Sequence, residues 1–187
     1  MARASQHKEN LLHTAVRLFR RQGYASTGLQ QILAESGAPK GSLYHYFPGG
    51  KEAIGAEAVA LAGRLVAETL ETLAKQHRSA KTFVRAYCRQ YADWMEESGF
   101  QSGCPIATTL LEEAPRSAPI TAAGRAAIDS WIAIIGEVYA RAGASPVEAK
   151  RQARFTISAL EGALILSRVT RSRDPILDVG HVVARML

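Results

Sequence analysis

The sequence predicts an all-α protein of about nine helices, and three observations support this fold class. Apolar residues recur every three or four positions along most of the chain. No alternating pattern typical of a β-strand is sustained. The seven prolines all lie where a helical repeat starts or stops, namely Pro39, Pro48, Pro105, Pro115, Pro119, Pro146 and Pro175.

The first 47 residues predict three helices in a helix-turn-helix arrangement. The first helix has an apolar stripe and ends at Gly23. Thr27 and Gln30 form a T-x-x-Q capping box, which we expect to open the second helix. That helix ends at Gly37, and a third helix is expected over residues 39–47 because proline is allowed at the first helical position. A short helix, a tight glycine turn and a second helix are typical of a helix-turn-helix.

Six further helices follow from the same signals. They are expected over residues 51–74, 80–97, 105–114, from just beyond Pro119 to Gly143, 146–169, and from Asp174 onward. A capping box with proline at its first helical position, Ser145-Pro146-Val147-Glu148, opens the fifth of them. The segment Pro48-Gly49-Gly50 predicts a joint between an N-terminal domain, residues 1–50, and a C-terminal domain, residues 51–187.

The positive charge is concentrated at the N-terminal end. Residues 1–51 contain seven basic and two acidic side chains, so this segment carries +5 of the chain's net charge of +6. A basic excess in a helix-turn-helix segment favours a partner that carries phosphates. Basic residues also commonly coat an ordinary solvated surface, so charge alone does not decide between these interpretations.

The third predicted helix presents chemistry that suits DNA. Leu43 and Phe47, four residues apart, are expected to face inward. The remaining side chains would point outward and offer a cation, hydroxyls and an imidazole to phosphates and base edges. They are Lys40, Ser42, Tyr44, His45 and Tyr46.

Residues 5–52 resemble the DNA-binding domain of the TetR/AcrR family of transcriptional regulators. The resemblance rests on Phe19 in the first helix, on the run GYASTGLQQILAESGAPKGSLYHYF, and on the lysine that opens the next helix. The linker FPGGKE has one extra residue before Lys51, and Tyr46 stands where the family most often has histidine. Together with GCPIA at Cys104 and LEGALILSR at Leu160, the linker is similar to a branch related to repressors of drug-efflux genes, the LmrA/YxaF-like branch.

The resemblance implies a homodimeric, ligand-responsive repressor that binds double-stranded DNA at a palindromic operator. We expect Lys40, Ser42, Tyr44 and His45 in the major groove, and Thr27, Tyr46 and Lys51 on phosphates. Gly41 completes the predicted DNA-binding set.

The last two predicted helices favour dimerisation. Between Phe155 and Leu166 only four residues are not apolar, so this helix needs neighbours on more than one side. Ala159, Gly162 and Ala163 allow close helix approach. We therefore expect the two helices to pair with their copies in a four-helix interface, as the resemblance also implies. The alternative is a fully buried monomer core.

The resemblance also implies a ligand cavity in the C-terminal domain. Aromatic residues are expected around it. Glu161 is the polar candidate, because a buried acid in so apolar a helix requires a partner such as Arg154, Arg168 or a ligand; a solvated position on the helix is the competing interpretation. The predicted ligand-binding set is Tyr87, Tyr91, Trp94, Trp131, Phe155 and Glu161. Each aromatic residue at helical spacing is by itself more often part of a plain core.

Other classes of protein find less support. No apolar run is long enough to cross a membrane and no secretory signal is present, so we expect a cytoplasmic protein. The five histidines are scattered, and no metal-binding, catalytic or phosphate-loop motif occurs, so we expect no enzyme, metal or cofactor. The alternative function is redox sensing by Cys104, whose thiol precedes a predicted helix start; a packed, inert thiol is the competing interpretation.

Overall fold

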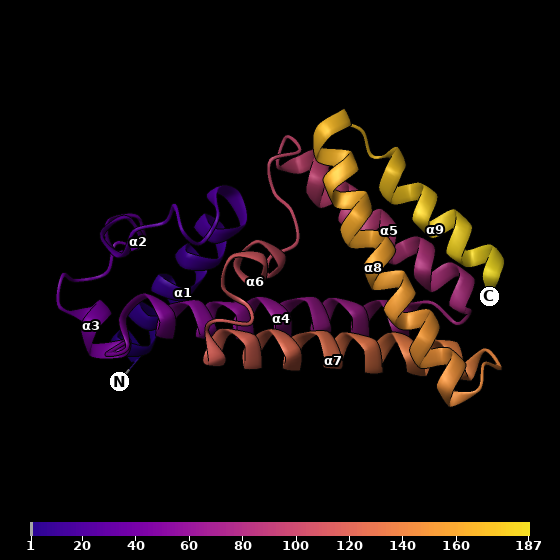
Figure 1. Cartoon of the computed structure of the whole chain (residues 1–187), viewed down its shortest axis with the longest axis horizontal. Helices are drawn as coiled ribbons and strands as arrows, with labels where there is room; N and C mark the ends of the chain where they lie inside the picture. Colours follow the sequence, from indigo (N-terminus) through magenta and orange to yellow (C-terminus); the bar gives the residue numbers. More distant parts are fainter. Residues whose placement is uncertain (1) are drawn as a thin grey trace. The chain divides into compact units, whose positions relative to one another are not determined.

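A computed structural model describes residues 2–187, and the side chains of residues 6–187. These residues form nine α-helices and no strand, as the sequence predicts (Figure 1). The helices are α1 (Ala2–Gln22), α2 (Leu29–Ser36), α3 (Ser42–Tyr46), α4 (Gly50–Gln76), α5 (Ala80–Glu97), α6 (Ala107–Glu113), α7 (Ala118–Arg141), α8 (Pro146–Thr170) and α9 (Asp174–Met186).

The chain divides into two compact units. The first consists of Met1–Arg64 and Cys104–Ala127, and the second of Leu65–Gly103 and Ile128–Leu187. Helices α4 and α7 each contribute residues to both units. The predicted domains, residues 1–50 and 51–187, are divided by expected function rather than by packing, and this division stays a prediction.

The core of the first unit is built on α1. Its inward stripe includes Leu11, Ala15, Leu18 and Phe19, whereas Val16 is only half-buried. The partners of this stripe, all buried, are Tyr24, Ile32, Leu33, Leu43, Phe47 and Ile54. Burial of this surface holds α2 and α3 against α1, because neither short helix is long enough to be stable alone.

Two helix starts in this unit differ from the sequence predictions. Gly28 is the N-cap of α2, without a side-chain cap, and the hydroxyl of Thr27 donates instead to the carbonyl of Gly23 at 2.7 Å. The expected capping box is therefore wrong. Helix α3 begins at Ser42 rather than at Pro39, because residues 39–42 form a turn in which the Ser42 N–H donates to the Pro39 carbonyl at 2.9 Å.

Small residues let the helices of the first unit approach closely. A methyl group on Gly63 of α4 would lie 2.5 Å from the Cβ of Ala127 on α7, and one on Gly55 would lie 2.8 Å from the Tyr24 ring. The side chain of Leu110 on α6 occupies the space over Gly124 of α7. Glycine is favoured at these positions by close packing rather than by a backbone conformation that other residues avoid.

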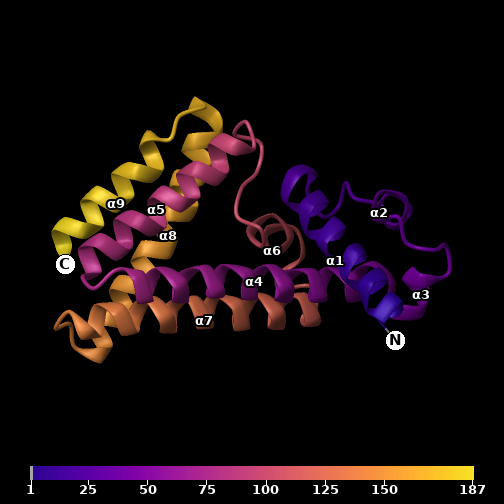
Figure 2. The same cartoon turned by 180° about the vertical axis from the view of Figure 1, so that it is seen from behind.

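The second unit is a bundle centred on α5. Helix α9 runs along α5, and the two lie side by side in both views (Figures 1 and 2). A Cβ on Gly180 of α9 would lie 3.0 Å from the Cβ of Cys88 on α5, so glycine permits the close approach of these two helices. Ser145 caps α8 by accepting the Glu148 N–H at 3.3 Å, as predicted. Tyr139 of α7 is fully buried, and its hydroxyl is hydrogen-bonded to Thr156 of α8 at 2.9 Å.

Candidate nucleic-acid interface

The turn between α2 and α3 is set by its backbone. Gly37 caps α2 in the left-handed conformation, at φ 66° and ψ 13°, where residues other than glycine are strained. The Ser36 hydroxyl donates to the Leu33 carbonyl at 2.9 Å and accepts the Ala38 N–H at 3.2 Å. These bonds end α2 at Ser36, and the turn at residues 37–38 changes the direction of the chain before α3 begins at Ser42.

Helix α3 divides into a buried face and an exposed face. Leu43 and Phe47 are buried, as predicted. Four of the predicted DNA-binding residues are exposed, and Ser42 and Tyr46 are half-buried. Tyr44 is 57% exposed, which is a large fraction for an aromatic residue. The exposed four are Lys40, Gly41, Tyr44 and His45.

The hydroxyl and ring groups of this face have defined local contacts. The Ser42 hydroxyl donates to the Pro39 carbonyl at 2.6 Å, so its oxygen keeps its capacity to accept a hydrogen bond. The rings of His45 and Tyr46 meet edge to face, with centroids 4.9 Å apart. The predicted face thus combines one cation with four side chains that can hydrogen-bond to a base edge or a phosphate.

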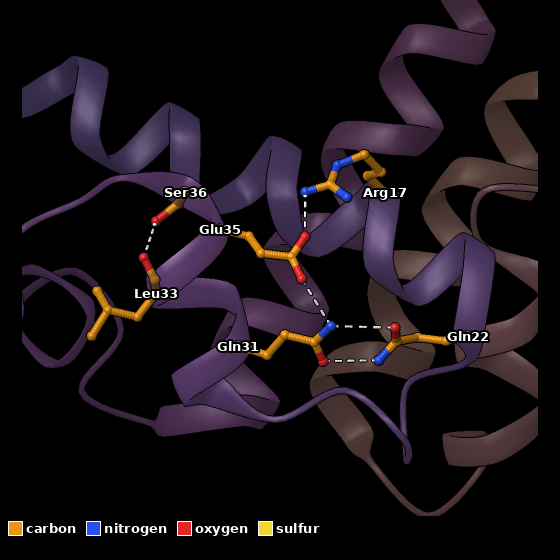
Figure 3. Close-up of polar contacts among 6 residues, drawn as sticks. All are labelled: Arg17, Gln22, Gln31, Leu33, Glu35 and Ser36. Carbon is orange, nitrogen blue, oxygen red and sulfur yellow. Dashed lines mark hydrogen bonds and ion pairs between the residues drawn. The ribbon is translucent and has the colours of Figure 1, made fainter.

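A polar network, which sequence analysis missed, ties α2 to α1 (Figure 3). Arg17 of α1 donates to Glu35 of α2 at 2.9 Å, and Gln31 donates to the other oxygen of Glu35 at 2.9 Å. The amide of Gln22 donates to Gln31 at 2.9 Å. The hydrogen bond from Gln31, and then that from Arg17, lower the pKa of Glu35. The i, i+4 spacing of Gln31 and Glu35 was the one available signal.

Two predicted phosphate ligands have other partners. Thr27 is fully buried with its hydroxyl bonded to Gly23, so the structure does not support a phosphate contact by this side chain. Lys51 is half-buried, and its ammonium donates to the Ala25 carbonyl at 3.2 Å and lies 4.5 Å from the centroid of the Tyr24 ring. Lys51 therefore fixes the start of α4 to the α1–α2 loop.

Comparison with known proteins identifies the family. Residues 11–58 match the family described as bacterial regulatory proteins, tetR family. Residues 80–182 match the one described as transcriptional regulator LmrA/YxaF-like, C-terminal domain. The chain is 33% identical over 183 residues to the HTH-type transcriptional regulator YxaF of Bacillus subtilis, covering 98% of this chain and 96% of YxaF. The chain belongs to the TetR family of transcriptional regulators.

Further comparisons agree with this assignment. The regulator is 32% identical over 184 residues to LmrA of Bacillus subtilis, covering 96% of each chain. Its fold matches a crystal structure of a TetR regulatory protein from Rhodobacter sphaeroides with a TM-score of 0.83, at 22% identity over 95% of this chain and 96% of that one. TetR regulators bind DNA and are dimers, and they are typically not enzymes. In the part of the chain that the structure describes, no helix is long and apolar enough to cross a membrane.

The predicted ligand-binding residues of the regulator all lie in the second unit, and they differ in exposure. Tyr87 and Tyr91 are buried on α5 in a row of rings that begins at Phe83 and ends at the half-buried Trp94. Trp131 is buried on α7. Phe155 does not join the buried aromatic residues, because its side chain is 47% exposed on the outer face of α8. Glu161 is half-buried, on the same helix.

Trp94 also lines a groove of about 470 Å³ between α4 and α5. Leu65 and Leu73 supply its apolar part. Its polar part consists of Glu68, Thr69, Thr72, Gln76 and Gln90. Of the predicted ligand-binding residues, only Trp94 is among the residues that line this groove.

The cysteines do not favour redox sensing. Cys104 is 3% exposed and lies three residues before α6, whose N-cap is Ile106, so its thiol is not at the helix start. Cys88 is fully buried, and burial raises the pKa of its thiol from 9.0 to about 12. The buried Cys88 thiol is thus a poor nucleophile, and the burial of Cys104 fits the packed, inert interpretation.

Proposed function

We propose that the regulator is a repressor that binds a palindromic operator and is released by a small apolar ligand. The observation that carries DNA recognition is the exposed surface formed by Lys40, in the turn before α3, and by Tyr44 and His45 of α3, while the buried Leu43 and Phe47 anchor this segment. The basic excess of residues 1–51 supplies the attraction to phosphates that such a face requires. We expect the protein to act in the bacterial cytoplasm, where operator DNA lies.

A palindrome requires two copies of this face, and the last two helices offer a surface for pairing. Helix α8 is buried on one side, whereas its other side exposes apolar side chains. The large exposed apolar residues of α8 and α9 are Phe155, Ile165, Leu166, Val169, Val182 and Met186, together with Val147 at the start of α8. Exposed apolar residues this numerous on two adjacent helices favour an isologous four-helix contact with a second copy. Dimerisation can then set two α3 helices about 34–36 Å apart, the distance between successive major grooves.

The aromatic row of α5 and the groove beside Trp94 support the ligand part of the proposal. Leu65, Leu73 and the indole ring give the groove apolar walls, and the hydroxyls and amides around them can orient a bound molecule. A ligand that prefers the non-binding state of the regulator by about 2.7 kcal/mol weakens DNA binding roughly a hundredfold. Induction needs no more than this difference in affinity.

Operator binding is tested by fluorescence anisotropy with fragments of the regulator's own promoter region. We expect Tyr44→Ala and Lys40→Ala to weaken binding to the operator, each by about 1–3 kcal/mol if it contacts a base, without lowering the melting temperature. Lys75→Ala is the matched control, because Lys75 is an exposed lysine near the end of α4 in the second unit. Wild-type protein that binds these fragments no better than random DNA contradicts the proposal.

A further inference from the structure

Helix α6 reaches the helix-turn-helix through one acidic side chain. Glu112 lies next to the last residue of α6, and its Oε2 accepts a hydrogen bond from the N–H of Ala25 in the α1–α2 loop. The two residues are 87 positions apart in the sequence and belong to the same compact unit. Helix α6 lies outside residues 1–50, the predicted DNA-binding domain, so this contact links that domain to a residue from another part of the chain.

The loop is shaped to receive this carboxylate. Gly23 adopts φ +89°, and a methyl group on it would lie 2.5 Å from Oε1 of Glu112. The backbone conformation favours glycine here, and a side chain at this position would have to displace the Glu112 carboxylate. Glu112 itself is half-buried, and Arg116 donates to its backbone carbonyl.

The same peptide segment is held from its other side by α4. The Ala25 carbonyl accepts the Lys51 ammonium at 3.2 Å, while the Ala25 N–H is bonded to Glu112. The Thr27 hydroxyl donates to Gly23 at 2.7 Å, and α2 begins two residues after Thr27. The segment that leads into α2 is thus fixed at Gly23 and on both polar groups of Ala25.

The position of α6 is fixed in turn by α7. The side chain of Leu110 fills the space over Gly124, where a methyl group would overlap with it. Leu110 and Glu112 are two residues apart on a single short helix, so a shift of Leu110 is expected to displace Glu112 as well.

We propose that Glu112 is a positioning residue for DNA recognition, which holds the α1–α2 loop, and through it α2 and α3, in the arrangement that reads the operator. The inference rests on the proposed operator recognition by the exposed face of α3. It reverses the sign expected from charge alone, because removal of an acidic residue should strengthen binding to a polyanion, whereas loss of a positioning contact should weaken it. Operator affinity is reduced by the fraction of molecules in which the loop is correctly placed.

The test compares Glu112→Ala, Glu112→Gln and the control Glu71→Ala, which removes one exposed acid of α4 in the second unit. Operator and random-DNA affinities are measured by anisotropy, with a thermal melt of each variant. A hydrogen bond to a charged group is strong enough for a tenfold effect, so we expect Glu112→Ala to weaken operator binding about tenfold or more. Random-DNA binding should be unchanged or slightly tighter, as should both affinities of Glu71→Ala. Glu112→Gln retains an acceptor oxygen and should recover most of the operator affinity.

Two further measurements test the role of Glu112 separately from the proposed operator recognition by α3. Hydrogen exchange at the Ala25 amide needs no DNA, and it should be about tenfold faster in Glu112→Ala than in the wild type. Gly124→Ala should weaken operator binding when Glu112 is present and add little in the Glu112→Ala background. Operator binding by Glu112→Ala at or above the wild-type affinity, or unchanged Ala25 exchange, overturns the positioning role. Failure of the wild type to bind any operator refutes the proposed function instead, while the exchange result still judges the Glu112 contact.

Discussion

The substitution Gly162→Glu tests the α8–α9 dimer without disturbing the protomer. Gly162 is exposed, and nothing lies within 4 Å of the Cβ that a side chain would add. Replacing a helical glycine by glutamate also stabilises the helix by about 0.5–1 kcal/mol. The variant should therefore fold as well as the wild type. In a symmetric contact, however, each dimer would bury two unpaired carboxylates, and at about 3 kcal/mol each their cost is about 6 kcal/mol.

A cost of this size raises the dimer dissociation constant roughly ten-thousandfold. Sedimentation equilibrium at micromolar concentration should show a folded monomer for Gly162→Glu and a dimer for the wild type. Ala142→Glu is the control, because it adds the same charge at an exposed position of the α7–α8 loop. A Gly162→Glu protein that remains dimeric with wild-type affinity would show that the interface lies elsewhere, and a monomeric wild type would refute the dimer itself.

Three further outcomes follow from the same structure. The slope of log affinity against log salt should fall by about one for Lys40→Ala and remain unchanged for Lys75→Ala, if Lys40 contacts a phosphate. Burial raises the pKa of Cys88 from 9.0 to about 12 and that of Tyr139 from 10.0 to about 12. The unfolded chain therefore loses these protons first, so the free energy of unfolding should fall as pH rises above about 9, by up to about 1.4 kcal/mol per pH unit and group. Denaturant melts should show a smaller loss of stability for Tyr139→Phe than for the wild type above about pH 10. Trp94→Ala should abolish the tryptophan quenching caused by an inducing ligand and leave operator affinity unchanged, and an unaltered ligand response would exclude the α4–α5 groove.

Local signals in the sequence predicted the helices well where a cap or a proline acted on the chain next to it. Ser145 and Pro146 open α8 as expected, and α5 covers residues 80–97 as predicted. The capping box at Thr27 failed because the buried hydroxyl found a partner in the Gly23 carbonyl, which only the folded loop brings within reach. The third helix starts late because residues 39–42 close a turn first.

The sequence predicted which residues of the candidate site are exposed, but not the contacts that hold the site in place. A helical repeat places Leu43 and Phe47 inward, and this alone exposes Tyr44 and His45. By contrast, the contact between Glu112 and Ala25 depends on how distant segments pack, and neither residue carries a signal for it. The role of Lys51 illustrates the same point, since sequence shows a basic residue and only the fold shows which carbonyl it binds.

The short length of α3 explains why these supports matter for recognition. A helix of five residues does not form stably by itself, so its direction must be imposed by its surroundings. Leu43 and Phe47 fix its inner face, but apolar packing resists rotation less strictly than directional hydrogen bonds do. The Arg17–Glu35 pair supplies such a directional contact to α2 itself, and the two bonds to Ala25 supply them to the loop that precedes α2. Base-specific contacts require side chains placed within a few tenths of an ångström. If α3 reads the operator as proposed, we expect its specificity to depend also on residues of α1, α4 and α6 that do not touch DNA themselves.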